Sequence, residues 1–196
     1  VFRWSDYYAP RALNRLFQAG VLARVATAPM ELLTTKGQVS LDRGAIIVPL
    51  ERQSVSLAAI HRMMEEVAFD NQITVHAAIS GRTVNVGVEL GGRTSVRDLE
   101  APKPLLVIGT GVSPYDAGEV WHLFDKRLNM PLTLVRKERL GRINLSDYTH
   151  VVLVGGNGSN VSKAMTGKLQ SWVKEGGTLV AHRHGAQWAA KSILGY

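Results

Sequence analysis

One stretch decides the fold of this chain, Gly176-Gly177-Thr178-Leu179-Val180-Ala181-His182-Arg183-His184-Gly185-Ala186-Gln187-Trp188-Ala189-Ala190. The glycine pair is typical of a helix end, and the four residues that follow form a short apolar run suited to a parallel sheet. Gly185 tolerates a sharp bend, and the alanines after it fall at helical spacing. The stretch therefore predicts a strand, a tight elbow and a helix, an arrangement that presents a nucleophile in many α/β enzymes.

Strand and helix signals alternate through both halves of the chain. In the first half we expect strands at 1–4, 22–27, 44–50 and 73–78, and helices at 6–20 and 54–67. For Glu31 to Asp42 the sequence leaves two alternatives, an irregular segment or a hairpin around Lys36-Gly37. In the second half we expect strands at 105–109, 132–135, 150–154 and 178–181, and helices at 115–128 and 161–174. This order predicts an α/β fold with a parallel sheet covered by helices on both faces.

The two halves match each other at a near-constant offset along the chain. Tyr8 corresponds to Tyr115, and Leu16-Phe17 corresponds to Leu123-Phe124. A period this long indicates duplicated domains rather than a solenoid. We therefore expect both halves to trace the same path of strands and helices.

The domain boundary follows from these matches. We expect one unit at 1–103 and a second at 104–196, connected by a linker at 91–104. Because a small sheet buries little surface alone, the copies should share an interface. Trp172 and Trp188 are the residues expected at that interface.

The composition limits the classes of protein to which the chain can belong. Its hydrophobic content is 45% and its charged content is 20%, which is ordinary for a globular protein. The chain has no cysteine, so disulfides and thiolate metal sites are excluded. No apolar run reaches the roughly 18 residues that a membrane helix requires, and we expect no membrane span.

The chain is basic, with a net charge of +7 and a pI of about 9.9. The densest basic cluster is Arg136-Lys137-Glu138-Arg139 with Arg142. Such a cluster is compatible with nucleic-acid binding. However, no aromatic residue is interleaved with it and no nucleic-acid motif accompanies it. We therefore predict a solvated loop here and no nucleic-acid partner.

The residues Ala181-His182-Arg183-His184-Gly185 resemble the elbow of the class I glutamine amidotransferase-like superfamily, which includes the PfpI-type proteases. The resemblance implies a flavodoxin-like three-layer sandwich with a parallel sheet, internally duplicated in this chain. Members of the superfamily carry a cysteine nucleophile where this chain has Arg183. A guanidinium is permanently protonated and cannot attack a carbonyl. Ala78 stands at the matching position of the first half, so we expect no nucleophile at either elbow.

Two glycine-rich loops follow strands that would end at the same edge of the sheet. Gly155-Gly156-Asn157 stands where an anion-binding loop is expected, and the resemblance implies that its backbone N–H groups belong to an oxyanion hole. The loop 109–114 would face the same crevice, at the carboxyl ends of the strands. The residues expected to bind a ligand there are Gly155, Gly156, Asn157, Arg183, His184 and Ser113.

Purely structural roles are open for the same residues. The glycine-rich loop is also consistent with a simple turn in which Ser159 or Asn160 caps the next helix. Arg183 suits a carboxylate or phosphate ligand, but an ion pair with Asp116 or Glu119 that fixes the fold is equally consistent with the sequence.

His182 and His184 form an H-x-H pair, which on a strand would point to one side and could chelate a metal. The only candidates for a third ligand are Asp116, Glu119 and His122. We therefore predict no metal site, with one histidine bonded to backbone at the sheet edge and the other facing solvent.

A second resemblance covers nearly the whole chain. The run from Ser113 to Leu123, followed by Asp125 and Met130-Pro131, resembles the C-terminal region of large bacterial zinc carboxypeptidases, and Tyr7–Leu13 resembles an earlier part of that region. The catalytic domain of those proteins carries a His-x-x-Glu zinc motif. Here His61 is followed by Glu65, which is one residue too far along.

These resemblances imply an accessory role. We expect a non-catalytic amidotransferase-like region of a larger zinc carboxypeptidase-like protein, which supports or positions peptide substrate for a catalytic domain that holds the zinc. That domain is the expected partner, the expected location is periplasmic or extracellular, and a chain that begins with Val1 is expected to be part of a larger protein. The alternatives are a stand-alone protein that binds a small anion near Gly155 and Arg183, and an active hydrolase.

Overall fold

The computed structural model describes residues 1–84, 88–156 and 162–195, and it divides the chain into two compact units, Val1–Ala101 and Pro102–Tyr196. The division falls two residues before the boundary that the sequence predicts. Within the described residues, no helix is both long enough and apolar enough to cross a membrane.

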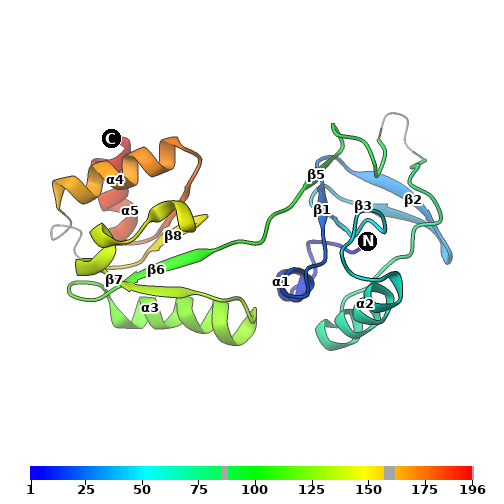
Figure 1. Cartoon of the computed structure of the whole chain (residues 1–196), viewed down its shortest axis with the longest axis horizontal. Helices are drawn as coiled ribbons and strands as arrows, with labels where there is room; N and C mark the ends of the chain where they lie inside the picture. The colour runs from blue at the N-terminus through cyan, green and yellow to red at the C-terminus, as the bar shows by residue number, and fades with distance from the viewer. Residues whose placement is uncertain (85–87, 157–161, 196) are drawn as a thin grey trace. The chain divides into compact units, whose positions relative to one another are not determined.

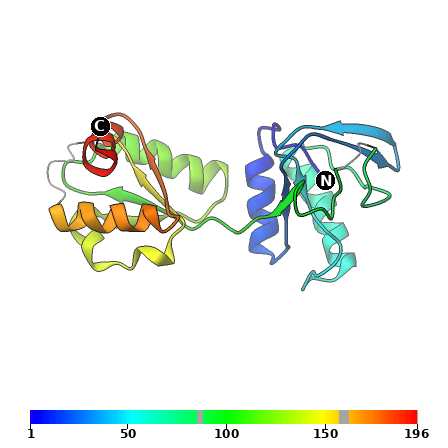
Figure 2. The ribbon, with the colours of Figure 1, turned by 90° about the horizontal axis from the view of Figure 1, so that it is seen from above.

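Unit 1 combines two helices with small antiparallel sheets (Figures 1 and 2). Its helices are α1 (Ala9–Gln18) and α2 (Leu57–Asn71). One sheet has the order β4-β1-β5, formed by Ile46–Ile47, Arg24–Ala26 and Val96–Asp98, and all its pairings are antiparallel. The other sheet is the hairpin of β2 (Met30–Thr34) and β3 (Gly37–Leu41), which is the second of the two alternatives for this segment.

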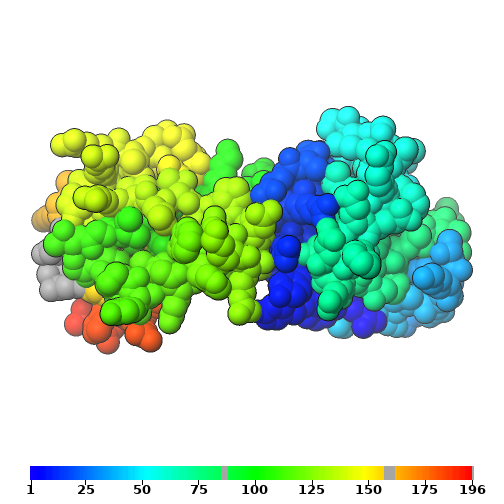
Figure 3. All heavy atoms as spheres, turned by 90° about the horizontal axis from the view of Figure 1, so that it is seen from below, coloured from blue at the N-terminus to red at the C-terminus, as the bar shows by residue number. Residues whose placement is uncertain are grey.

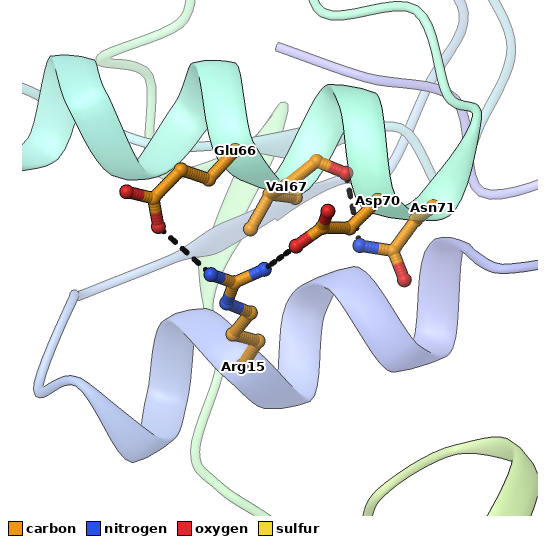
Figure 4. Close-up of polar contacts among 5 residues, drawn as sticks. All are labelled: Arg15, Glu66, Val67, Asp70 and Asn71. Atoms are coloured by element: carbon orange, nitrogen blue, oxygen red, sulfur yellow. Dashed lines mark hydrogen bonds and ion pairs between the residues drawn. The ribbon is translucent and has the colours of Figure 1, made fainter.

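The helices of unit 1 pack on each other through an apolar core and a charged margin. Leu16 of α1 and Ile60 and Val67 of α2 are buried in one cluster with Phe2. At the margin, Arg15 of α1 forms ion pairs with Glu66, at 2.8 Å, and with Asp70 (Figure 4). Beside them, the buried side chain of Asn71 donates a hydrogen bond to the carbonyl of Val67 at 2.9 Å.

Several sequence predictions for unit 1 are wrong. The segments 1–4 and 73–78 form only isolated bridges, in which Phe2 lies between Ile46 and Val75. The predicted linker at 91–104 contains β5, which pairs with β1 inside the unit. Short antiparallel strands of two or three residues carry too little periodicity to be recognised from sequence.

Unit 2 is a parallel sheet with the strand order β7-β6-β8-β9. Its strands are β6 (Pro104–Ile108), β7 (Thr133–Arg136), β8 (His150–Leu153) and β9 (Thr178–Ala181). Its helical segments are α3 (Pro114–Trp121), η1 (His122–Arg127), η2 (Lys137–Arg142), η3 (Leu145–Asp147), α4 (Lys163–Lys174), α5 (His184–Ala189) and η5 (Ala190–Leu194). The parallel α/β prediction is confirmed for this unit.

Helices cover both faces of this sheet (Figure 1). Leu106 and Val152 pack with Ala117 of α3 on one face. The alternate residues Leu105 and Val151 pack on the other face, with the side chains of α4 and α5. Figure 3 looks onto the α3 side of the unit. The period of two along each buried strand thus divides its side chains between two helical layers.

The predicted duplication is wrong in its topology. The sheet of unit 1 is antiparallel with the order β4-β1-β5, whereas the sheet of unit 2 is parallel with the order β7-β6-β8-β9. The two halves therefore do not trace the same path. Trp172 and Trp188, predicted at an interface between the copies, belong to the core of unit 2, where Trp172 packs closely over Gly177.

Candidate functional site

The candidate site lies at the carboxyl edge of the sheet in unit 2, where the chain order reverses. The chain leaves β6 for β7 and then returns to β8 on the opposite side of β6. Ligands of open α/β sheets bind at such a switch point. The loops after β6 and β8 meet there, because Val112 forms a bridge with Gly156 and the N–H of Ser113 donates to the carbonyl of Gly155 at 2.7 Å.

The predicted elbow is present, but Arg183 makes the bend. This residue joins β9 to α5 with φ of 53° and ψ of −129°. Such a backbone conformation is rare for a side chain with a Cβ, and it costs roughly 1–3 kcal/mol. Gly185 instead lies inside α5, where an added Cβ would approach the carbonyl oxygen of Val154 to 2.6 Å. The prediction that Gly185 makes the bend is therefore wrong; this glycine permits close packing of α5 on β8.

Arg183 forms an ion pair with Asp116, one of the two partners that the sequence suggested. The Nη1 atom of Arg183 lies 3.2 Å from Oδ1 of Asp116. Asp116 is only 4% exposed, whereas the side chain of Arg183 is 68% exposed. Asp116 lies in the first turn of α3, and Ser113 caps that helix by accepting a hydrogen bond from the N–H of Asp116 at 3.3 Å. Ser113 thus has a structural role that positions the carboxylate.

The second carboxylate oxygen of Asp116 accepts a hydrogen bond from Gly155, whose N–H the resemblance assigns to an oxyanion hole. The N–H of Gly155 donates to Oδ2 of Asp116 at 3.1 Å. A Cβ added to Gly155 would lie 2.0 Å from the same oxygen, so only glycine permits this contact. A buried carboxylate therefore receives one hydrogen bond from backbone and one charge-assisted contact from Arg183, which is a satisfied arrangement.

A second carboxylate, which the sequence did not indicate, is that of Glu138 in η2. The N–H of Thr110 donates to Oε1 of Glu138 at 3.2 Å. Hydrogen bonds from the backbone of Glu138 itself and from Thr110 hold the pKa of the Glu138 carboxyl below its usual value of 4.5. The loop after β6 thus donates the N–H of Thr110 to Glu138, and the loop after β8 donates the N–H of Gly155 to Asp116.

The remaining predicted residues contribute less to the arrangement. Gly156 lies in the bridge with Val112, and an added Cβ would meet the carbonyl oxygen of Gly111 at 2.1 Å. His184 is exposed at the start of α5. Asn157, like Ser159 and Asn160, lies outside the described residues. The cap of α4 is Ser162, whose hydroxyl accepts from the N–H of Met165 at 3.2 Å.

Two hollows lie beside these loops, and both are apolar. The one beneath the loops has a volume of about 40 Å³ and is lined by side chains such as Leu140, Leu153 and Trp188. The other has a volume of about 420 Å³ and lies between α3 and β7, with Trp121 and Leu134 in its wall. The first is far smaller than the hundreds of cubic ångströms that a small-molecule ligand fills.

Within the described ranges, no three or more His, Cys, Asp or Glu side chains lie close enough together to hold a metal ion. The H-x-H pair therefore has no third ligand within that part of the chain. The chain matches no family model, no curated protein and no solved structure.

Proposed function

We propose that this chain is a non-catalytic, amidotransferase-like accessory region of a larger zinc carboxypeptidase-like protein. In that role it supports or positions peptide substrate for a metallopeptidase domain that carries the zinc. The observation that carries the non-catalytic half of the proposal is the ion pair between Arg183, at the elbow, and the buried Asp116. The carboxypeptidase half rests on the sequence resemblance that extends from Ser113 to Pro131.

The geometry of the elbow supports an amidotransferase-like origin for unit 2. Arg183 keeps a strained strand-to-helix conformation of the kind that presents a nucleophile. The strand order β7-β6-β8-β9, with helices on both faces, is compatible with a flavodoxin-like sandwich. Strained backbone persists where the surrounding structure holds it, and here the Asp116 carboxylate fixes the side chain of the strained residue.

The same geometry opposes acyl transfer at this elbow. Acyl transfer requires a nucleophile and a set of donors aimed at the developing oxyanion. Arg183 supplies no nucleophile, and the N–H of Gly155 already donates to Asp116. A negative carboxylate at that position would repel a negatively charged intermediate. Substrate support, rather than turnover, is the role that remains for this edge of unit 2.

The alternative function, binding of a small anion near Gly155 and Arg183, has one observation in its favour. The donors at this position do hold an anion, since both oxygens of Asp116 are engaged there. An external carboxylate or phosphate would therefore have to displace Asp116. A calorimetric titration with acetate or phosphate tests this alternative, which predicts binding to the wild-type chain.

Reading the gene around the segment that encodes Val1–Tyr196 tests the main proposal. The proposal predicts a zinc-peptidase motif, His-x-x-Glu with a distant histidine, in the same reading frame upstream of Val1. A frame that encodes these residues without any metallopeptidase domain would refute the carboxypeptidase assignment. It would leave the non-catalytic reading of the elbow intact, because that reading rests on Arg183 and Asp116 alone.

A further inference from the structure

The basic segment after β7 is a fixed helical turn rather than the solvated loop that the sequence predicts. Lys137–Arg142 forms a 3-10 helix, η2, and Leu140 within it is only 1% exposed. The ammonium group of Lys168, from α4, donates to the carbonyl of Gly141 at 3.2 Å and also to that of Ile143. Glu138 is bonded to the N–H of Thr110. The segment is thus anchored to the core, to α4 and to the loop after β6.

This anchoring orients the arginines outward. A 3-10 helix has three residues per turn, so side chains three residues apart lie on one face. Arg139 and Arg142 therefore share a face, and Leu140 is directed into the core. Arg136 immediately precedes the helix and is also exposed. We call Arg136, Arg139 and Arg142 the arginine face.

The described residues of unit 2 place no carboxylate in an ion pair with the arginine face. None of the three arginines is in an ion pair with any side chain in the ranges that the structure describes. Glu138, the single acidic residue of the segment, is directed to Thr110 instead. Lys168 adds another positive charge next to Gly141. Because the backbone of η2 is already fixed, binding of an anion by these guanidinium groups orders side chains but not the main chain.

We propose that the arginine face is a docking surface for an extended, acidic segment of a partner protein. Along a 3-10 helix, residues three apart are separated by about 6 Å. In an extended peptide, residues two apart are separated by about 6.7 Å. Carboxylates at alternate positions of such a segment therefore match the spacing of Arg139 and Arg142, and guanidinium binds carboxylate in a bidentate manner.

A protein segment fits this surface better than a nucleic acid does. The helix η2 spans only about 12 Å, which corresponds to about four residues of an extended peptide. Single-stranded nucleic acids are held by aromatic side chains as well as by charge, and the segment 136–142 contains no aromatic residue. This docking surface is independent of the proposed function, because it does not involve the elbow or a parent protein.

Fluorescence anisotropy on the full chain tests this docking surface. The probe is a labelled peptide of five Glu-Thr repeats, titrated with protein at low salt, and a Lys-Thr repeat peptide and a labelled single-stranded oligonucleotide serve as comparisons. The variant Arg139→Glu/Arg142→Glu is compared with Arg43→Glu/Arg62→Glu, which changes the net charge equally at two exposed arginines of unit 1. The milder Arg139→Gln/Arg142→Gln is included in case the first variant folds poorly.

The expected result is binding of the Glu-Thr peptide that weakens about tenfold or more in the Arg139/Arg142 variants and less than about twofold in the unit 1 variant. Equal weakening in both double Glu variants would mean that net charge alone is responsible, and would overturn the assignment. Absence of peptide binding at low salt, or tighter binding of the oligonucleotide than of the peptide, would overturn it as well.

Discussion

Asp116 and Arg183 are joined at the edge of unit 2 by an ion pair of 3.2 Å between Oδ1 and Nη1, although one is buried and the other largely exposed. The other oxygen of Asp116 accepts from Gly155. One carboxylate therefore connects the start of α3, the loop after β8 and the elbow after β9. These three parts of unit 2 are therefore held together by contacts within the unit.

Removal of the buried carboxylate should destabilise the protein. In Asp116→Ala the N–H of Gly155 loses its acceptor, and an unsatisfied buried donor costs about 1–3 kcal/mol. The contribution of Arg183 is smaller, because a largely exposed ion pair is screened by water. Chemical denaturation should show a lower free energy of unfolding for Asp116→Ala than for the wild type. The control is Asp125→Ala, which removes a more exposed carboxylate. Equal losses in the two variants would contradict the role given to Asp116.

The strained backbone at the elbow gives a comparison between two substitutions at one position. Arg183→Gly and Arg183→Ala both remove the ion pair, but only glycine adopts φ of 53° with ψ of −129° without strain. The glycine variant should therefore be more stable than the alanine variant by about 1–3 kcal/mol. Thermal and denaturant unfolding measure the difference. An alanine variant as stable as the glycine variant would show that the elbow is not strained.

Two glycines near Asp116 should respond in opposite directions to substitution by alanine. Gly155→Ala places a methyl group against Oδ2 of Asp116 and should cost about 1–3 kcal/mol through overpacking. Gly118→Ala lies in α3 with no atom near the added methyl group, and should gain about 0.5–1 kcal/mol from helix propensity. Unfolding measurements on both variants test this contrast, which a loss of stability in Gly118→Ala would undermine.

Glu138 should make stability depend on pH in a defined direction. Its pKa is lower in the folded chain than the usual value of 4.5, so the folded state binds fewer protons than the unfolded state. Its contribution is therefore fully present above about pH 4.5 and is lost as the pH falls through the lowered pKa. The difference in melting temperature between wild type and Glu138→Gln, measured from neutral to acidic pH, should shrink on acidification. A difference that grows towards acidic pH would contradict this sign.

The sequence predicts the architecture of unit 2 better than that of unit 1, and the reason is physical. The central strands of unit 2, β6 and β8, are buried on both faces, so the runs Leu105–Ile108 and Val151–Leu153 are continuously apolar and easy to recognise. Unit 1 is built from short antiparallel strands, and β5 even contains Arg97 and Asp98. The match of Leu16 with Leu123 does not reflect a shared environment, because Leu16 of α1 is fully buried whereas Leu123 of η1 is 43% exposed.

The sequence predicts which residues lie at the candidate site, but it does not predict which groups these residues contact. Gly155, Ser113 and Arg183 do meet at one edge, as strand order and loop composition indicate. That Asp116 binds two of these groups depends on the register of α3 against β8, which no local pattern encodes. The contact of Glu138 with Thr110 escapes prediction for the same reason, since it joins η2 to the loop after β6, 28 residues apart in the chain.

The most direct test of the central claim is an assay of hydrolysis by the purified chain on peptide, amide and ester substrates, run alongside Ser113→Ala and Arg183→Ala. The elbow residue Arg183 cannot act as a nucleophile, and the N–H of Gly155 already donates to Asp116. The proposed function therefore predicts no turnover above the buffer rate for any of the three proteins. Turnover by the wild-type chain that disappears on substitution of either Ser113 or Arg183 would contradict the account.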